Sequence, residues 1–222
     1  MAYCLASKGA ALMRREEDMP FNRMVWSKSG RAVGRIFLEH ALMMSEILVG
    51  VTSACEKSGG VVRYYSAEEL APLPNRTTNE AGAFRWSIQL GGRRIGLVPD
   101  AVFILEYESG GPEPERVVCF LEADRGTMPI RRRNPALSSF SRKLDAYAAL
   151  WKRGDIEKRF GTKRVAVHAV TTSEERSENL RKAIKSLPQG QGLFAVHSFL
   201  DPAAVVQAMV SHSVPSDKRR NI

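Results

Sequence analysis

The chain has 222 residues, which is enough for one sizeable hydrophobic core and a small appendage. Hydrophobic residues make up 44% of it and charged residues 26%, and no run of about 18 apolar residues predicts a membrane span. Lysine and arginine number 33 against 24 acidic residues. The resulting net charge of +9 favours a polyanionic partner, most commonly nucleic acid, over an ordinary basic surface.

Cysteine usage and the N-terminus both favour a cytoplasmic protein. The three cysteines, Cys4, Cys55 and Cys119, are scattered and show neither a disulfide framework nor zinc-ligand spacing. The first residues lack the basic lead and the apolar stretch of an export signal. We therefore expect reduced thiols and a cytoplasmic location.

The first half of the chain predicts a helix followed by strands. Residues 3–13 have the pattern of a short strand that runs into a helix, and a polar linker follows. Apolar residues three and four positions apart predict a long helix over residues 31–57. Gly91-Gly92 is a strong hairpin-turn signal between two strands. The strands predicted in this half cover residues 61–65, 84–90, 94–106 and 116–124.

The second half predicts alternating helices and strands. An apolar stripe predicts a second long helix over residues 137–151, and Asp201-Pro202 is typical of a helix start. Together the elements predict one α/β domain with a mixed central sheet flanked by helices. The other predicted segments are a strand at 164–171, a helix at 173–186 and a strand at 193–199. The α/β domain spans 31–213, and a disordered basic tail covers 214–222.

A β-hairpin is predicted across residues 98–125. Both of its strands are continuous apolar runs, AVFIL and VVCFL, so they should be central and covered on both faces. If the hairpin is symmetric about Gly111, Glu106 faces Arg116 as an opposite-charge pair.

The same register places Asp100 opposite Glu122, and side-chain alternation places Asp124 on the face of Glu122. Three carboxylates buried together are unfavourable unless a cation or a proton is shared. One interpretation is a Mg²⁺ or Mn²⁺ site that polarises a phosphodiester. The other is that the strands emerge into solvent here and the acids pair with Arg125 or Arg94. Spacing alone does not choose between them.

Two resemblances favour the metal site. Pro99-Asp100, with Glu122-Ala-Asp124 on the next strand and a helix on either side, resembles the PD-(D/E)xK nuclease fold, which has a helix, three strands, a helix and a strand. The segments LVPDAVF and FLEADRGT resemble the replication-relaxation family of plasmid and mobile-element proteins. That likeness extends over residues 2–183 and includes the weaker segments YCLASKGAALM, FLEH and KLDAY.

In that family a winged helix usually precedes the nuclease-like domain. Residues 1–30 are similar to the closing strand and helix of such a wing, followed by a linker. We therefore expect a remnant of a winged helix in front of a restriction-endonuclease-like αβββαβ core. The recognition helix that would read DNA is not expected in this segment.

The nuclease resemblance also assigns roles to individual residues. It implies that Asp100 and Glu122 hold the metal, that Asp124 supports them, and that Glu39 on the first helix adds an acid. Such nucleases usually carry a lysine where this chain has Asp124. Some supply it from the following helix, where Lys143 is the candidate. For Glu39 and Lys143 the ordinary alternative is a solvated side chain.

Arginines flank the acidic residues on both sides in the sequence. A basic loop next to a metal site is well placed to bind phosphate, and a solvated basic loop is the alternative. The residues predicted to contact DNA are Arg93, Arg94, Arg125, Arg131, Arg132 and Arg133.

Two functions stay open at this point. The first is a metal-dependent DNA endonuclease or nickase that acts in replication or mobilisation of a plasmid or mobile element. The second is a catalytically inactive, DNA-binding replication-accessory protein that keeps the nuclease fold. Protein partners are compatible with either, and the sequence does not define the oligomeric state. Because the chain has no P-loop, Rossmann fingerprint or nucleophile elbow, NTP-driven and acyl-transfer chemistry are disfavoured.

Overall fold

The computed structural model describes residues 35–57, 59–64, 86–108, 113–126, 128–133 and 137–213. The chain divides into two compact units, Met1–Leu42 and Met43–Ile222, and the packing described below is that of the second unit. The predicted winged-helix remnant at 1–30 and the predicted tail at 214–222 lie outside the described residues.

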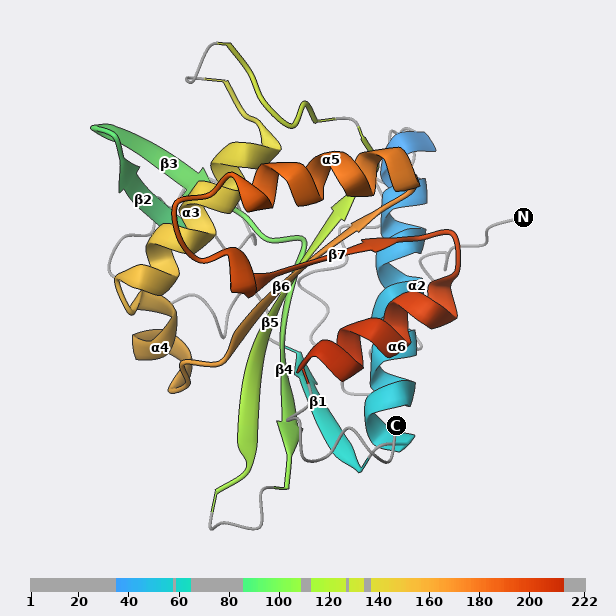
Figure 1. Cartoon of the computed structure of the whole chain (residues 1–222). Helices are drawn as coiled ribbons and strands as arrows, with labels where there is room; N and C mark the ends of the chain where they lie inside the picture. Colours follow the sequence, from blue (N-terminus) through green and yellow to red (C-terminus); the bar gives the residue numbers. More distant parts are fainter. Residues whose placement is uncertain are drawn as a thin grey trace, which may run out of the picture. The chain divides into compact units, whose positions relative to one another are not determined.

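The second unit contains a five-stranded mixed sheet in the order β1-β4-β5-β6-β7 (Figure 1). β1 and β5 each pair antiparallel with β4, whereas β6 pairs parallel with β5 and β7 parallel with β6. The strands are β1 (Gly60–Tyr64), β4 (Ala101–Tyr107), β5 (Glu115–Asp124), β6 (Val165–Thr171) and β7 (Phe194–Ser198).

Helices cover both faces of this sheet, as the sequence predicted. The helix α2 (Arg35–Lys57) crosses the boundary between the two units, and its part from Met43 onward packs on the sheet. The remaining elements are α3 (Phe140–Lys152), α4 (Asp155–Phe160), α5 (Glu174–Lys185), the short 3-10 helix η2 (Gln191–Leu193) and α6 (Pro202–Ser213). Of these, α4 and η2 were not predicted. No described helix is long and apolar enough to cross a membrane.

The strand predicted over residues 94–106 was wrong as one element. The chain instead forms β3 (Arg93–Leu97), a break at residues 98–100, and then β4. A proline at position 99 has no N–H to donate to a strand partner, which favours the break there. Among the described strands, β3 pairs with β2 (Trp86–Leu90) alone, in a separate two-stranded sheet. The Gly91-Gly92 hairpin is therefore confirmed, but its two strands do not join the central sheet. The third antiparallel strand beside β4 and β5 is β1.

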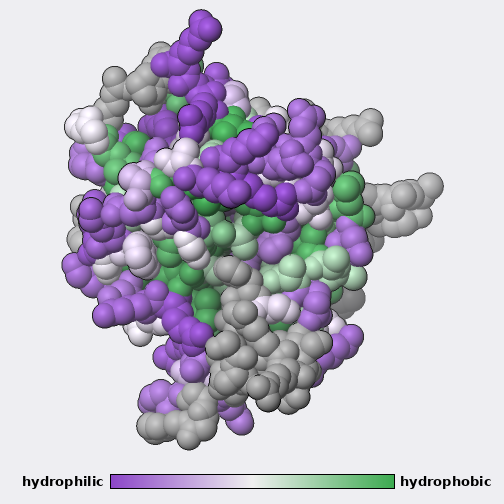
Figure 2. Space-filling model, viewed as in Figure 1, coloured by the Kyte–Doolittle hydropathy of each residue, from purple (hydrophilic) through white to green (hydrophobic). Residues whose placement is uncertain are grey.

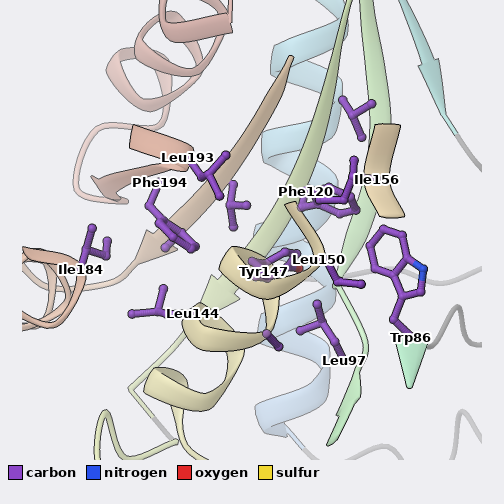
Figure 3. Packing of buried hydrophobic residues seen from close by; sticks show 14 of the residues in the cluster. Trp86, Leu97, Phe120, Leu144, Tyr147, Leu150, Ile156, Ile184, Leu193 and Phe194 are labelled. Atoms are coloured by element: carbon purple, nitrogen blue, oxygen red, sulfur yellow. The ribbon is translucent and has the colours of Figure 1, made fainter. Parts of the chain in front are cut away.

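One core lies between the sheet and helices α3, α4 and α5. The rings of Phe120 on β5 and Tyr147 on α3 have centroids 5.2 Å apart, and those of Phe120 and Trp86 have centroids 5.5 Å apart (Figure 3). Offset aromatic pairs of this kind add stability beyond the area they bury. This packing seats α3 against the middle of β5.

A second core lies on the opposite face of the sheet, against α6 and the described part of α2 in this unit. Leu121 and Cys119 of β5 point into it and are fully buried. β5 is therefore covered on both faces, as its continuous apolar run predicted. Because its side chains alternate, the even-numbered residues from Val118 to Asp124 all lie on the α3 and α5 face.

Side-chain caps determine where α3 and α5 begin. Ser139 accepts a hydrogen bond from the Arg142 N–H at 3.4 Å, and Ser173 accepts one from the Arg176 N–H at 3.2 Å. Each cap satisfies a backbone donor that the first helical turn leaves without a partner. The predicted start of α5 at Ser173 is confirmed.

Gly60 should be intolerant of a side chain, because a Cβ built there lies 2.5 Å from the Tyr107 ring and 2.7 Å from the Cys55 sulfur. We expect Gly60→Ala to lower the free energy of unfolding by about 1–3 kcal/mol, the usual effect of overpacking. This exceeds the roughly 0.4–1 kcal/mol that alanine contributes by restricting the unfolded chain. Urea unfolding followed by circular dichroism measures the difference.

Gly192→Ala is the matched control, since a Cβ there meets nothing within 4 Å. It should leave stability unchanged or slightly raised. Equal stability of the two variants would contradict the close packing of β1 against Tyr107.

Candidate functional site

The predicted register of the β4–β5 hairpin is confirmed. Phe103 faces Cys119, and Glu106 faces Arg116, whose Nε lies 2.9 Å from Glu106 Oε1. The register therefore brings the start of β4 next to the end of β5, where the predicted acidic residues lie.

Asp100 lies directly before β4 and is exposed to solvent. Its N–H donates to the Leu121 carbonyl at 3.0 Å, and its Oδ2 accepts a hydrogen bond from the Ala123 N–H at 2.8 Å. The carboxylate thus takes the place that a backbone carbonyl would have if β4 continued. This contact fixes Asp100 beside Glu122, the residue between its two backbone partners.

Glu122 is almost fully buried, with 1% of its surface exposed. Its Oε1 accepts a hydrogen bond from the Tyr147 hydroxyl at 2.7 Å, and its Oε2 forms an ion pair with the Lys143 ammonium. Lys143 and Tyr147 are four residues apart on α3, so they share one face of the helix. α3 therefore supplies both partners of this buried carboxylate.

Burial raises the pKa of Glu122 to about 7, and the nearby Asp100 charge adds to the rise. The charge of Lys143, and the hydrogen bonds from Lys143 and Tyr147, act in the opposite direction. Burial also tends to lower the pKa of Lys143, but the negative charges of Glu122, Asp100 and Asp124 outweigh it and raise that pKa. Lys143 is therefore a stable cation among the three acids.

Asp124 lies on the same face of β5 as Glu122, as predicted, but it has different partners. Its Oδ2 accepts a hydrogen bond from Arg176 Nε at 2.7 Å, and its Oδ1 accepts one from the Gly126 N–H at 3.0 Å. Arg176 on α5 also donates to the Met128 carbonyl. Asp124 thus ties the end of β5 to α5 and to the loop that follows the strand.

The three acids share one end of the sheet without forming a three-ligand metal cage. Among the described residues, no group of three or more histidine, cysteine, aspartate or glutamate side chains is placed to hold a metal ion. With Asp124 paired to Arg176, the remaining oxygen donors are Asp100 and Glu122. Glu39 lies on α2 in the first unit, and its metal role stays a prediction.

The predicted arginines divide between two places. Arg94 belongs to the β2–β3 hairpin, where its Nε donates to Ser87, and the side chain of its neighbour Arg93 lies outside the described residues. The others follow β5 in the chain, on the loop whose first turn Asp124 holds. These are Arg125, which is half-buried, and Arg131, Arg132 and Arg133, which are exposed.

Sequence reasoning missed two residues of this site, Tyr147 and Arg176. Tyr147 belonged to the apolar stripe of its helix and to the weaker family segment KLDAY but was given no role in the site, although its position four residues after Lys143 was a usable signal. Arg176 is separated from Asp124 by 52 residues, and no local pattern marks it as a partner.

The pH dependence of stability tests the environment of Glu122. Its pKa lies above the ordinary 4.5, so the folded chain binds this proton more tightly than the unfolded chain does. The resulting stabilisation is fully present below about pH 4.5 and is lost as the pH rises through about 7. Glu122→Gln removes the titration, so its stability relative to wild type should increase across this window. Urea unfolding in chelator at several pH values measures the difference.

Glu178→Gln, which removes an exposed carboxylate from α5, is the control and should follow the wild-type pH profile. Parallel profiles for Glu122→Gln and wild type would show that Glu122 is not in the buried environment described above.

Comparison with known proteins identifies the family. A family model described as replication-relaxation matches residues 1–166, a span that includes Asp100, Glu122, Asp124 and Lys143. No match was found among curated proteins or among solved structures. Because the family match covers most of the chain, the protein belongs to the replication-relaxation family, and this membership suggests a role in the replication or mobilisation of a plasmid or mobile element.

Proposed function

We propose that the protein processes DNA during replication or mobilisation of a plasmid or mobile element. In this proposal it has a nuclease-like site in which Asp100 and Glu122 hold the metal and Lys143 stands beside them. The observation that carries this proposal is the ion pair between Lys143 and Glu122. β5 has Asp124 where a nuclease of the PD-(D/E)xK type usually has its lysine. An ammonium group that reaches the strand acid from α3 is the expected replacement.

The order of the elements supports the same proposal. Around the acidic residues the chain forms α2, then the three antiparallel strands β1, β4 and β5, then α3 and the short helix α4, and then the parallel strand β6. This is the helix, three-strand, helix, strand order of the PD-(D/E)xK core, with the β2–β3 hairpin as an insertion between β1 and β4. Asp100 lies directly before β4, the second of the antiparallel strands, and Glu122 lies on β5, the third.

Asp100 and Glu122 are suitable donors for Mg²⁺ or Mn²⁺. Both ions prefer carboxylate oxygens, and Mg²⁺ in phosphate-processing sites is commonly held by one or two carboxylates, water and the substrate phosphate. A two-carboxylate donor set therefore fits such an ion without a third protein ligand. When bound, the ion would polarise a phosphodiester and favour attack by water.

The side chains of the chain itself have distinct parts in this proposal. Asp100 is exposed, so a phosphate group in solution can approach it. Lys143, whose side chain is 24% exposed, holds the orientation of Glu122 and presents positive charge where negative charge develops on a phosphate. Tyr147 is buried and fixes the second oxygen of Glu122. All three are held by α3 or by the end of the β4–β5 hairpin.

A catalytically inactive DNA-binding protein is the second candidate, and a specific observation favours it. Both oxygens of Glu122 already accept hydrogen bonds, and Asp124 is paired with Arg176. A buried polar network with every member satisfied is stable without a metal. In this alternative the acids would hold α3 and α5 in place, and DNA binding would depend on the basic surface.

Cleavage assays separate the two candidates. We expect wild type to nick or cut supercoiled DNA with Mg²⁺ or Mn²⁺ and not with chelator. Asp100→Asn, Glu122→Gln and Lys143→Met should each lose about 100-fold or more of this activity, because each removes an interaction with the reacting phosphate or its activator. Product formation on agarose gels over time gives the rates.

Lys152→Met is the matched control, since it removes an exposed lysine from the last turn of the same helix. It should keep wild-type activity, and circular dichroism should show that all variants are folded. DNA that is bound but left intact by wild type with every metal would favour the inactive candidate. Neither binding nor cleavage would reject both.

A further inference from the structure

The loop that follows β5 is firmly anchored at its base. We define the arginine loop as residues 128–133. The N–H groups of Phe140 and Ser141, in the first turn of α3, donate to the carbonyls of Pro129 and Ile130 at 3.0 and 2.9 Å. The Met128 carbonyl accepts a hydrogen bond from Arg176. The backbone of the arginine loop is therefore held by both α3 and α5.

Arg131 fixes the loop to the other end of α5. Its guanidinium donates to the hydroxyl of Ser186, the C-cap residue of α5, and that hydroxyl donates in turn to the Ala183 carbonyl at 2.7 Å. Burial raises the pKa of Asp145 on α3, and the charge of Arg131 acts against that rise, so the guanidinium also lies within electrostatic reach of α3. Arg131 is thus an anchor between the two helices.

The side of α5 that Arg131 contacts carries two lysines. Lys182 lies four residues before Ser186 and three residues before Lys185. Residues at these spacings lie on one side of a helix. Both lysines are exposed. The space-filling view shows strongly hydrophilic side chains over α5 (Figure 2). The acidic residues of this helix, Glu174, Glu175 and Glu178, all lie in its first half.

The arginine loop and the second half of α5 thus form one positively charged surface. Arg132 and Arg133 are exposed on the loop, and the Nε of Arg132 donates to the Ser138 carbonyl at 2.8 Å, which holds its stem. Like charges on one surface repel one another, and that repulsion is relieved when a polyanion binds and its counterions are released. The Arg176 contact to Asp124 joins this surface directly to the acidic end of the sheet.

From this arrangement we infer that Arg132, Arg133, Lys182 and Lys185 form the surface that binds the phosphate backbone of duplex DNA, with Arg131 as its positioning residue. The inference rests on the proposed function and names its DNA-binding surface. Duplex DNA is the partner because its regular double row of phosphates matches cations on two adjacent elements, a loop and a helix. The two lysines have no assigned role in the acidic site.

The lysines also have an ordinary structural role, because cations in the last turn stabilise a helix through its dipole. That role predicts a small loss of stability on substitution and no effect on DNA. The two roles are therefore separated by measuring DNA affinity and stability on the same variants.

The experiment is binding of a labelled DNA duplex, followed by fluorescence anisotropy over a range of salt concentrations in chelator. The variants are Lys182→Gln with Lys185→Gln, and separately Arg132→Gln with Arg133→Gln. Each double variant should weaken binding and reduce the slope of log K against log salt by about 2, close to 1 for each phosphate contact. Circular dichroism checks that each is folded.

The control is Lys158→Gln with Lys163→Gln, which removes the same charge from exposed positions on α4 and just before β6. Asp124 pairs with Thr171 at the other end of β6. The slope of the control should equal that of wild type. Suppose that wild type binds DNA but both double variants keep the wild-type slope, or that the slope of the control variant falls as much as theirs. Either result would reject the surface and leave the proposed function standing. Tighter binding of an RNA duplex with the same sensitivity would overturn the choice of DNA. No binding of DNA by wild type would reject the proposed function itself, and the surface with it.

Discussion

The buried contact of Glu122 with Lys143 and Tyr147 determines how this end of the domain is built. A carboxylate with 1% of its surface exposed is strongly unfavourable in an apolar core unless its charge and both oxygens are satisfied. Both partners come from α3, so the contact fixes the rotation of this helix about its axis and its position along the sheet. The aromatic contact between Tyr147 and Phe120 reinforces the same placement, because it holds the ring that carries the hydroxyl to Glu122. A hydrophobic face alone would allow α3 to slide.

β5 is the second constraint, since both of its faces are buried over most of its length. Its odd residues, such as Leu121, pack against α6 and α2, and its even residues, such as Phe120, pack against α3, α4 and α5. A shift of one residue in its pairing would move Glu122 and Asp124 into the largely apolar core against α2 and α6. The register is therefore fixed by the cost of burying the acids there as much as by the apolar contacts.

The sequence was most informative where structure is local. Residue alternation, the symmetry of the turn and the opposite charges of Glu106 and Arg116 were enough to predict the β4–β5 register. The interruption at Pro99 was missed because the apolar pattern continues through it. The separate β2–β3 sheet was missed because hairpin signals say which strands are joined but not which sheet they enter.

For the site, the sequence predicted the clustering of Asp100 and Glu122, and a family resemblance singled out Lys143. The partner of Asp124 was beyond either kind of reasoning. The contact with Arg176 depends on α5 returning over the end of β5 after two intervening helices and a strand, which only the complete fold determines. Tyr147 lay between these cases, since helical spacing relates it to Lys143 but does not reveal that its hydroxyl meets a buried acid.

The two pairs of charges at this end of the sheet differ in what they allow. In the pair of Asp124 and Arg176 the aspartate is buried and the arginine is largely buried, with exposed fractions of 4% and 16%. Arg176 also holds the loop backbone through the Met128 carbonyl. Breaking the pair would leave an unpaired charge in the interior, so it suits a permanent support. Lys143 is more exposed, at 24%, and it faces Glu122 close to the exposed Asp100. A ligand role for Glu122 requires one of its oxygens to exchange a hydrogen bond for a new partner. The exchange is least unfavourable at Lys143, because that ammonium group can reach solvent or a phosphate, whereas the buried Tyr147 hydroxyl has no such alternative.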